Sequence, residues 1–431
     1  MWKVLEIPGR RNRRVLSNFL SLSVVQFANY AAPLITLPYL FRVLGPSHYG
    51  LIEFARAITL YFVILTDYGF SLSATRQVSI HRDDPQRLSE IFSAVMLLKL
   101  LLVALSFLAM AALVLAVPRL RADWPVYFLS FGHVVGMALL PLWFSRGLER
   151  VRFMAILSAG TRLLVIVMIL AFVRDQADYV YVPLVHSLGY VLAGAVGLVA
   201  VIRSSSVRFR IPSLALLEQE LRDGWDIFVS KVATRLYRTS GAVILGLLTN
   251  HTFVAYYAAG EKIVWAVQGL QEPVSQAVFP HIGQLASESK QAALAFAAKV
   301  AKILCGVMLA ASLALFAGAP WVARLALGEQ FHAGVSVIRI LSLLPVITAF
   351  SNVFGVQVMV NFGLKRLLAR ILIAAGVLNV AAALCVAGPL KHEGVAVVSL
   401  ATEIFVTLAM FIALRQNDLD VFDARVCKPI A

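Results

Sequence analysis

The sequence predicts an all-α membrane protein that crosses the bilayer about twelve times. Of its 431 residues, 60% are hydrophobic and only 14% are charged, whereas soluble domains carry roughly a quarter charged residues. Apolar runs of about 18 residues or more recur from one end of the chain to the other, which is the signal for transmembrane helices. No polar stretch is long enough to form a soluble domain of about 100 residues.

The expected spans fall into two groups of six, with boundaries at charged residues and at proline or glycine breaks. In the first half they are 15–40, 50–72, 90–117, 124–145, 153–173 and 179–202. In the second half they are 226–248, 253–280, 296–318, 334–360, 367–388 and 393–414. The first run follows four arginines between positions 10 and 14 but is too long for a secretory signal, so we expect an uncleaved helix.

The distribution of positive charge predicts the orientation of these spans. An even number of spans places both termini on one side, and cytoplasmic loops carry an excess of lysine and arginine. With the termini inside, the cytoplasmic segments hold 22 of these residues and the outside loops hold 6. We therefore expect cytoplasmic termini. The net charge of +15 does not indicate nucleic-acid binding, because most of it is explained by the excess of lysine and arginine in cytoplasmic loops and by their attraction to anionic lipid.

The longest connection, at about 203–225, separates the two groups of spans. We expect an N-terminal lobe of residues 1–213 with helices 1–6 and a C-terminal lobe of residues 214–431 with helices 7–12. Within the connection, LALLEQELRDGW has the pattern of an amphipathic helix on the inner membrane surface, and a solvated linker is the alternative. The segments GPSHYGLIEFARAI (45–58) and TNHTFVAYYAAGEKI (249–263) occupy equivalent places in the two halves, which indicates a parallel repeat with a site between the lobes.

Two stretches resemble a known family. PLITLPYLFRVLGPSHYGLIEFARAITLYFVILTDYGFSLSATRQVS (33–79) contains Pro-Tyr-Leu at 38–40, Tyr-Gly at 49–50 and Asp-Tyr-Gly-Phe at 67–70. PLWFSRGLERVR (141–152) follows the fourth expected span. Both are similar to the polysaccharide-transport family of bacterial O-antigen and repeat-unit flippases, within the multidrug/oligosaccharidyl-lipid/polysaccharide exporter superfamily. The resemblance implies a V-shaped, two-lobe exporter fold in the bacterial inner membrane that moves a lipid-linked sugar unit from the cytoplasm to the outer face.

The same motifs also have structural interpretations. Pro33 and Pro38 are expected to kink or end the first helix, and Gly45 and Gly50 allow a tight turn. Trp143 lies near the inner membrane face, where a tryptophan usually anchors the helix at the interface. Gly147, Glu149 and Arg150 are expected to shape a loop.

Cations inside the expected spans are the candidate substrate-binding residues, because a buried positive charge in a membrane is costly and is usually functional. They are Arg56, Arg162, Lys231, Arg235 and Arg238. Lys231, Arg235 and Arg238 line one stripe of the seventh helix, although Lys231 can also snorkel to the inner interface, as can Lys99. Arg56 has Glu53 one turn away as a structural partner. Arg162 has no acidic residue one turn away and needs a partner from another helix, water or a ligand.

Acidic residues inside the spans are candidates for coupling transport to an ion gradient, because a buried carboxylate can carry a proton. They are Asp67, Glu261 and Glu403. The alternative for each is a structural ion pair between helices. His133 and His186 lie in apolar surroundings and are expected to be core residues rather than proton relays.

A lipid pyrophosphate, or an acidic sugar attached to it, would suit arginine-lined cavities, because guanidinium groups form paired hydrogen bonds to such anions. We therefore expect an alternating-access flippase with H+ or Na+ as a possible coupling ion, and a polysaccharide polymerase and a chain-length regulator as possible partners. A multidrug/cation antiporter of the same superfamily, a membrane-embedded polymerase or ligase, and a cell-wall precursor flippase are the alternatives. The sequence contains no GxxxxGK[ST] loop, and its three scattered cysteines indicate neither a disulfide nor a metal site, so no catalytic residue, cofactor or metal is expected.

Overall fold

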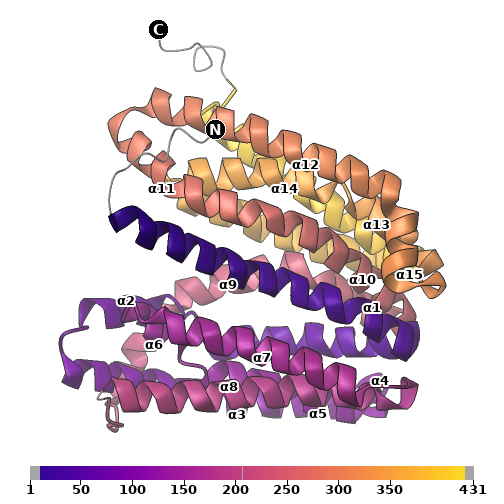
Figure 1. Ribbon diagram of the computed structural model, residues 1–431, viewed down its shortest axis with the longest axis horizontal. Coiled ribbons are helices and arrows are strands. Elements are labelled where there is room, and N and C mark those ends of the chain that lie inside the picture. The colour runs from indigo at the N-terminus through magenta and orange to yellow at the C-terminus, as the bar shows by residue number, and fades with distance from the viewer. Residues whose placement is uncertain (1–9, 206, 423–431) are drawn as a thin grey trace.

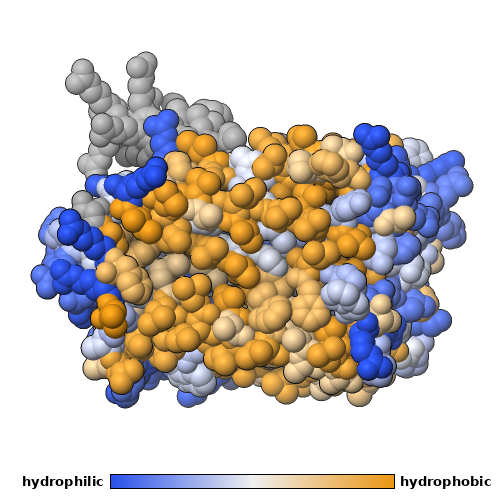
Figure 2. Space-filling view, turned by 90° about the horizontal axis from the view of Figure 1, so that it is seen from below, coloured by the Kyte–Doolittle hydropathy of each residue, from blue (hydrophilic) through white to orange (hydrophobic). Residues whose placement is uncertain are grey.

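The computed structural model describes the backbone of residues 10–205 and 207–422 and, from residue 34 onward, their side chains except that at 237. Every regular element in these residues is a helix, and the helices form two bundles arranged as a V (Figure 1). The prediction of an all-α, two-lobe architecture is confirmed. Figure 2 shows a broad apolar belt between two polar ends, as expected for a protein surrounded by lipid.

The N-terminal lobe contains six membrane passes. The helix α1 (Arg10–Asp67) is broken at Gly45, whose φ of 71° is left-handed, so it makes two passes. The others are α3 (Pro85–Ala116), α5 with α6 (Trp124–Leu139 and Leu142–Gly147), α7 (Val151–Phe172), and η2 with α8 (Gln176–Val180 and Tyr181–Ser204). The short helices α2 (Ser73–Ile80) and α4 (Pro118–Ala122) connect them.

The C-terminal lobe repeats this arrangement. Its first passes are α9 (Leu214–Leu248), α10 with η3 and α11 (His251–Gln268, Gly269–Gln271 and Glu272–Glu288), and α12 (Lys290–Leu327). After η4 (Glu329–Gly334), the next pass is α13 (Val335–Leu341), α14 (Leu344–Ser351) and the π-helical η5 (Asn352–Met359). The helix α15 (Lys365–Gln416) is broken at Lys391, where φ is 51°, and makes the last two passes.

By length and composition alone, eight helical stretches among the described residues could cross a membrane. This number is smaller than twelve partly because the two passes of α15 count once. Of α9, only 238–248 qualifies as a shorter apolar helix, because basic residues interrupt the apolar sequence before it. The passes that are hardest to recognise by hydropathy are therefore those that carry polar residues between the lobes.

Two expectations about local structure are wrong. The helix α1 runs past Pro33 and Pro38 without ending and breaks only at Gly45. Gly50 lies inside a helix rather than in the turn: a Cβ atom added there would be 1.7 Å from the carbonyl oxygen of His251. Gly50 therefore permits α1 and α10 to approach closely, which is a packing role instead of a conformational one.

The buried core shows which end of the molecule is closed. One apolar cluster joins both lobes around Phe41, Tyr49, Phe54, Val254 and Ile338, near the Gly45 break; we call this the Gly45 end. At the opposite end, which holds α2 and is called the α2 end, two separate clusters belong mainly to the C-terminal and N-terminal lobes. The lobes are thus packed together at the Gly45 end and divided at the α2 end, where the V opens (Figure 1).

The segment 214–225 is not a separate surface helix, because it forms the first turns of α9. Ser213 caps this helix by accepting a hydrogen bond from the Leu216 amide at 3.3 Å. Leu217 and Leu221 pack on the N-terminal lobe, and Tyr68 stacks on Phe228 with 4.9 Å between ring centroids. Further along, Ser240 donates a hydrogen bond to Asn379 of α15 at 3.0 Å, so α9 touches both lobes. The boundary between the N-terminal and C-terminal lobes at 213/214 therefore stays a prediction.

Glu220, in the first turns of α9, is only 1% exposed, and its Oε2 has no hydrogen-bond partner among the described residues. Burial, together with the nearby Asp223, raises the pKa of Glu220 to about 7 against the opposing effect of Arg87. A carboxyl group whose folded-state pKa is raised binds more protons in the folded state. The folded state therefore loses stability as pH rises from the unfolded pKa of about 4.3 through 7.

We expect Glu220→Gln to remove this loss and to raise the melting temperature above pH 7 by about 2–4 °C, with little change near pH 5. Thermal unfolding of the purified protein across this pH range measures the effect. Glu218→Gln is the matched control, because Glu218 is exposed and paired with Arg222 at 2.7 Å. Equal pH profiles for both variants would contradict the prediction.

Candidate functional site

Two cavities lie between the helices, and Trp265 of α10 lines both. The deep cavity, of about 400 Å³, is lined by parts of α1, α5, α7, α8 and α10. The wide cavity, of about 660 Å³, is lined by parts of α1, α3, α5, α6, α9 and α10. Both therefore combine residues of the two lobes, as expected for a site that alternately faces each side of a membrane.

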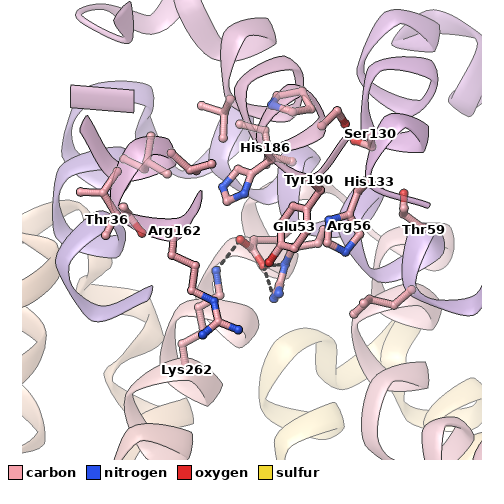
Figure 3. A pocket seen from close by; sticks show the side chains of 18 of the residues that line it. Thr36, Glu53, Arg56, Thr59, Ser130, His133, Arg162, His186, Tyr190 and Lys262 are labelled. Atoms are coloured by element: carbon pink, nitrogen blue, oxygen red, sulfur yellow. Dashed lines mark hydrogen bonds and ion pairs between the residues drawn. The ribbon is translucent and has the colours of Figure 1, made fainter. Parts of the chain in front are cut away.

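The deep cavity contains an ion-pair network that joins the lobes (Figure 3). Glu53 of α1 is 5% exposed and accepts from Arg56 at 2.8 Å and from Lys262 of α10 at 2.5 Å. Lys262 also donates to the Tyr49 hydroxyl at 2.9 Å. The side chain of Arg56 is 50% exposed, so much of it is accessible in the cavity despite this ion pair.

Arg162 of α7 completes the positive charge of the deep cavity. Among the described residues, no carboxylate lies within ion-pair distance of its guanidinium group. Figure 3 shows Arg162 on the same side of the cavity as Lys262 and Glu53. With three cations and a single carboxylate, this cavity has an excess of positive charge available to an anion.

The wide cavity gathers more cations. Its basic residues come from three helices, α3, α6 and α9: Lys99, Arg146, Lys231, Arg235 and Arg238. Asp67 accepts a hydrogen bond from Lys231 at 2.5 Å and lies 4.0 Å from Lys99. Lys231 also donates to the Ser71 hydroxyl. Asp67 is therefore the internal counter-ion of a cluster in which the cations outnumber it.

All five cations expected to bind substrate line these cavities, Arg56 and Arg162 in the deep one and Lys231, Arg235 and Arg238 in the wide one. Of the expected coupling residues, Asp67 lines the wide cavity. The other two lie behind the cavities: Glu261 accepts a hydrogen bond from the Tyr257 hydroxyl at 3.1 Å, and Glu403 accepts one from Ser351 at 2.8 Å. The predicted pair between Glu53 and Arg56 is confirmed.

Sequence reasoning missed several residues of the site. Lys99 does not snorkel to the interface, since it is 3% exposed and lines the wide cavity. Trp143 is not an interfacial anchor, because it is 2% exposed and lines the same cavity. His133 and His186 line the deep cavity. The signal for Lys262 was a charge inside α10, about three turns after the polar turn at 249–252, but its partner Glu53 is 209 positions away.

The Gly45 end is sealed by contacts between the lobes. Besides the approach at Gly50, Phe54 fills the space beside Gly246, where an added Cβ would be 2.2 Å from its ring. Arg119 of the N-terminal lobe donates hydrogen bonds to the carbonyl oxygens of Leu247, at 3.2 Å, and Thr249 at the end of α9. These carbonyls end a helix and have no partner within it, so a cation satisfies them. The cavities are thus closed at this end.

Comparisons with known proteins agree with this architecture. The family model described as polysaccharide biosynthesis protein matches residues 15–286. A protein of Escherichia coli (strain K12) described as "Putative O-antigen transporter" is 31% identical over 402 residues, which covers 93% of this chain and 97% of that protein. A protein of Shigella dysenteriae with the same description is 25% identical over 405 residues, covering 92% and 99%.

Two solved structures share the fold. One is the inward-facing conformation of a multidrug resistance MATE family transporter of the MOP superfamily, with a TM-score of 0.69, 17% identity and coverage of 93% of this chain and 96% of that one. The other is the lipid II flippase MurJ in an inward closed conformation, with a TM-score of 0.64, 10% identity and coverage of 92% and 87%. At these identities the likeness concerns the two-lobe fold alone.

Proposed function

Since the chain belongs to the family of polysaccharide biosynthesis proteins, we propose that it is a flippase for a polyprenyl-pyrophosphate-linked oligosaccharide repeat unit. It moves the unit from the cytoplasmic to the outer leaflet of the inner membrane. The observation that carries this proposal is the pair of cation-rich cavities between lobes that are joined at the Gly45 end and divided at the α2 end. An anionic headgroup has favourable partners there, and its polyprenyl chain can stay in lipid.

The two cavities suit different parts of this substrate. The wide cavity offers arginine and lysine to the pyrophosphate, because these side chains bind phosphate oxygens through charge-assisted hydrogen bonds. The deep cavity has hydroxyl groups and rings suited to a sugar, from Thr59, Ser130 and Tyr190, beside Arg56 and Arg162. A drug exporter for cations would need the opposite charge, and a polymerase or ligase would need a site for two sugar substrates outside the bilayer.

Ion coupling is part of the proposal. Asp67 contacts Lys231, so an anion that binds Lys231 competes with Asp67 and frees its carboxylate to take up H+ or Na+. Glu261 is one residue before Lys262 and has a neutral hydroxyl partner, which allows either the protonated or the ionised form. Glu403 also has a neutral hydroxyl partner, that of Ser351, which allows either form of its carboxyl group. That a polysaccharide polymerase and a chain-length regulator are partners of this protein is also a proposal.

The orientation can be tested by reporter fusions. At the Gly45 end, Ser47 follows the break in α1, Ala122 ends α4 and Asn250 lies between α9 and α10, whereas Asp84, Ser205 and Lys365 lie at the α2 end. We expect fusions at the first three positions to report the outer side and fusions at the last three to report the cytoplasm. An inverted result at one of the first three would contradict the twelve-span topology.

Transport is tested with purified protein in vesicles that contain a labelled pyrophosphate-linked oligosaccharide in one leaflet. We expect the protein to move the label to the other leaflet, where an added sugar-cleaving enzyme releases it. Cation export is tested with the same vesicles loaded with ethidium. Polymerase activity is tested by measuring the chain length of the oligosaccharide after the assay. Ethidium export without movement of the oligosaccharide would favour the antiporter, and lengthened chains would favour the enzyme.

A further inference from the structure

The connection between the lobes is fixed along the surface of α3 before α9 begins. The backbone amide of Arg208 donates to the Ser89 hydroxyl at 3.2 Å, and that of Arg210 donates to the Ser93 hydroxyl at 2.9 Å. Both serines are buried, and Val207 packs into the apolar cluster of the α2 end at 4% exposure. Two hydrogen bonds at alternate residues hold this segment extended, so the side chains that point away from α3 have a defined position.

The outward side chains of this segment are large and apolar. Phe209 is 68% exposed, Ile211 90% and Leu214 84%. Clustered exposure of this kind is unfavourable in water and marks a surface that contacts lipid or another apolar partner. Ser93 lies near the start of the expected third span, 90–117, so the segment that binds it lies at the depth where that span begins.

Basic side chains accompany these apolar ones. Arg203, Arg208 and Arg210 are exposed, and in the part of the chain that the structure describes none has a carboxylate within 4.0 Å. Two exposed or half-exposed carboxylates close to them in sequence pair with other arginines, Glu90 with Arg87 at 3.0 Å and Glu218 with Arg222 at 2.7 Å, and Glu220 is buried. A surface of phosphate headgroups would balance the three free charges.

We propose that the segment 207–214 is a binding site for anionic phospholipid in the leaflet at the α2 end. Phe209, Ile211 and Leu214 insert among the upper acyl chains, and Arg208 and Arg210 bind the headgroup phosphates. This combination of apolar insertion and basic flanks is the chemistry by which interfacial segments bind anionic membranes. The site holds the connection between the lobes at a fixed depth, and it does not depend on which substrate the cavities carry.

The charge requirement is tested by thermal unfolding of the purified protein in phosphatidylcholine vesicles with and without phosphatidylglycerol. We expect phosphatidylglycerol to raise the melting temperature of the native protein and to do so much less for the Arg208→Gln/Arg210→Gln variant. Each arginine contributes about fivefold to the affinity for an anionic surface. Arg366→Gln/Arg370→Gln is the matched control, since it removes two exposed charges from the same end in the other lobe. Equal loss of stabilisation in both variants would contradict a specific site.

Insertion is tested with a fluorophore on Ile211→Cys in a variant whose three native cysteines are replaced by alanine. We expect quenching by phosphatidylglycerol brominated on its acyl chains and protection from iodide in the water. The same label on Asp83→Cys, whose side chain is 97% exposed, should respond to iodide instead. Quenching of the label at 211 by iodide, but not by brominated lipid, would overturn the proposal and favour a protein partner at this surface. This result is independent of transport.

Discussion

Arg235→Ala and Arg238→Ala are each expected to lower binding of the pyrophosphate-linked oligosaccharide about ten- to hundredfold while the protein accumulates normally. Both arginines line the wide cavity, three residues apart on α9, with Lys231 one turn before Arg235. A hydrogen bond between charged groups contributes about 1.5–3 kcal/mol, which corresponds to this loss in affinity. Binding to the purified variants, and surface polysaccharide in cells that lack their own flippase, measure the effect.

Two further variants separate binding from structural damage. Arg→Lys at either position should recover only part of the affinity, because a lysine cannot form the planar two-pronged contact of a guanidinium group. Arg370→Ala removes an exposed charge outside the cavities and should change neither binding nor surface polysaccharide. Low membrane abundance of the Arg→Ala variants would point to a structural role, because loss of one partner strands a buried charge. Normal abundance with normal polysaccharide in both would contradict the ligand role.

The sequence predicts the architecture because the relevant signals are local. Apolar length defines most passes, and the positions of lysine and arginine predict the orientation. The expected turns near Gly45 and Asn250 are confirmed by a helix break at Gly45 and by the Asn250 side chain, which caps α10. The start of the seventh helix was placed twelve residues too late, because 214–225 is too polar to be counted as a span although it continues the same helix.

The cavities could be predicted only in part. The stripe formed by Lys231, Arg235 and Arg238 follows from helical spacing, and the structure places all three on one cavity. The contact of Asp67 with Lys231 joins residues 164 positions apart, and that of Glu53 with Lys262 joins residues 209 apart. Such partners depend on how the lobes pack, which no local pattern contains. For the same reason Lys99, near the end of its expected span, could not be distinguished from a lysine that snorkels.

The last prediction concerns the closed Gly45 end. We expect Gly50→Ala to open this end, because the new methyl group would lie 1.7 Å from the carbonyl oxygen of His251 and 3.0 Å from the Ala255 amide nitrogen. Backbone atoms cannot rotate away as a side chain can, so α1 and α10 must separate. Overpacking of this kind costs about 1–3 kcal/mol, which shifts the ratio of closed to open molecules on the order of five- to hundredfold.

The separation would also stretch the pair between Glu53 and Lys262, which lies one turn further along α1 and joins the same two helices. Once that pair breaks, Glu53 still has Arg56, whereas Lys262 loses its carboxylate, so the open state exposes a cation toward the Gly45 end. Val254→Cys, buried beside this contact, reports the opening through its rate of alkylation by a membrane-impermeant maleimide, in a background without native cysteines. Gly160→Ala is the matched control, since nothing lies within 4 Å of a Cβ atom there. A Gly50→Ala protein that accumulates normally and is alkylated no faster than the control would show that this crossing does not hold the lobes closed.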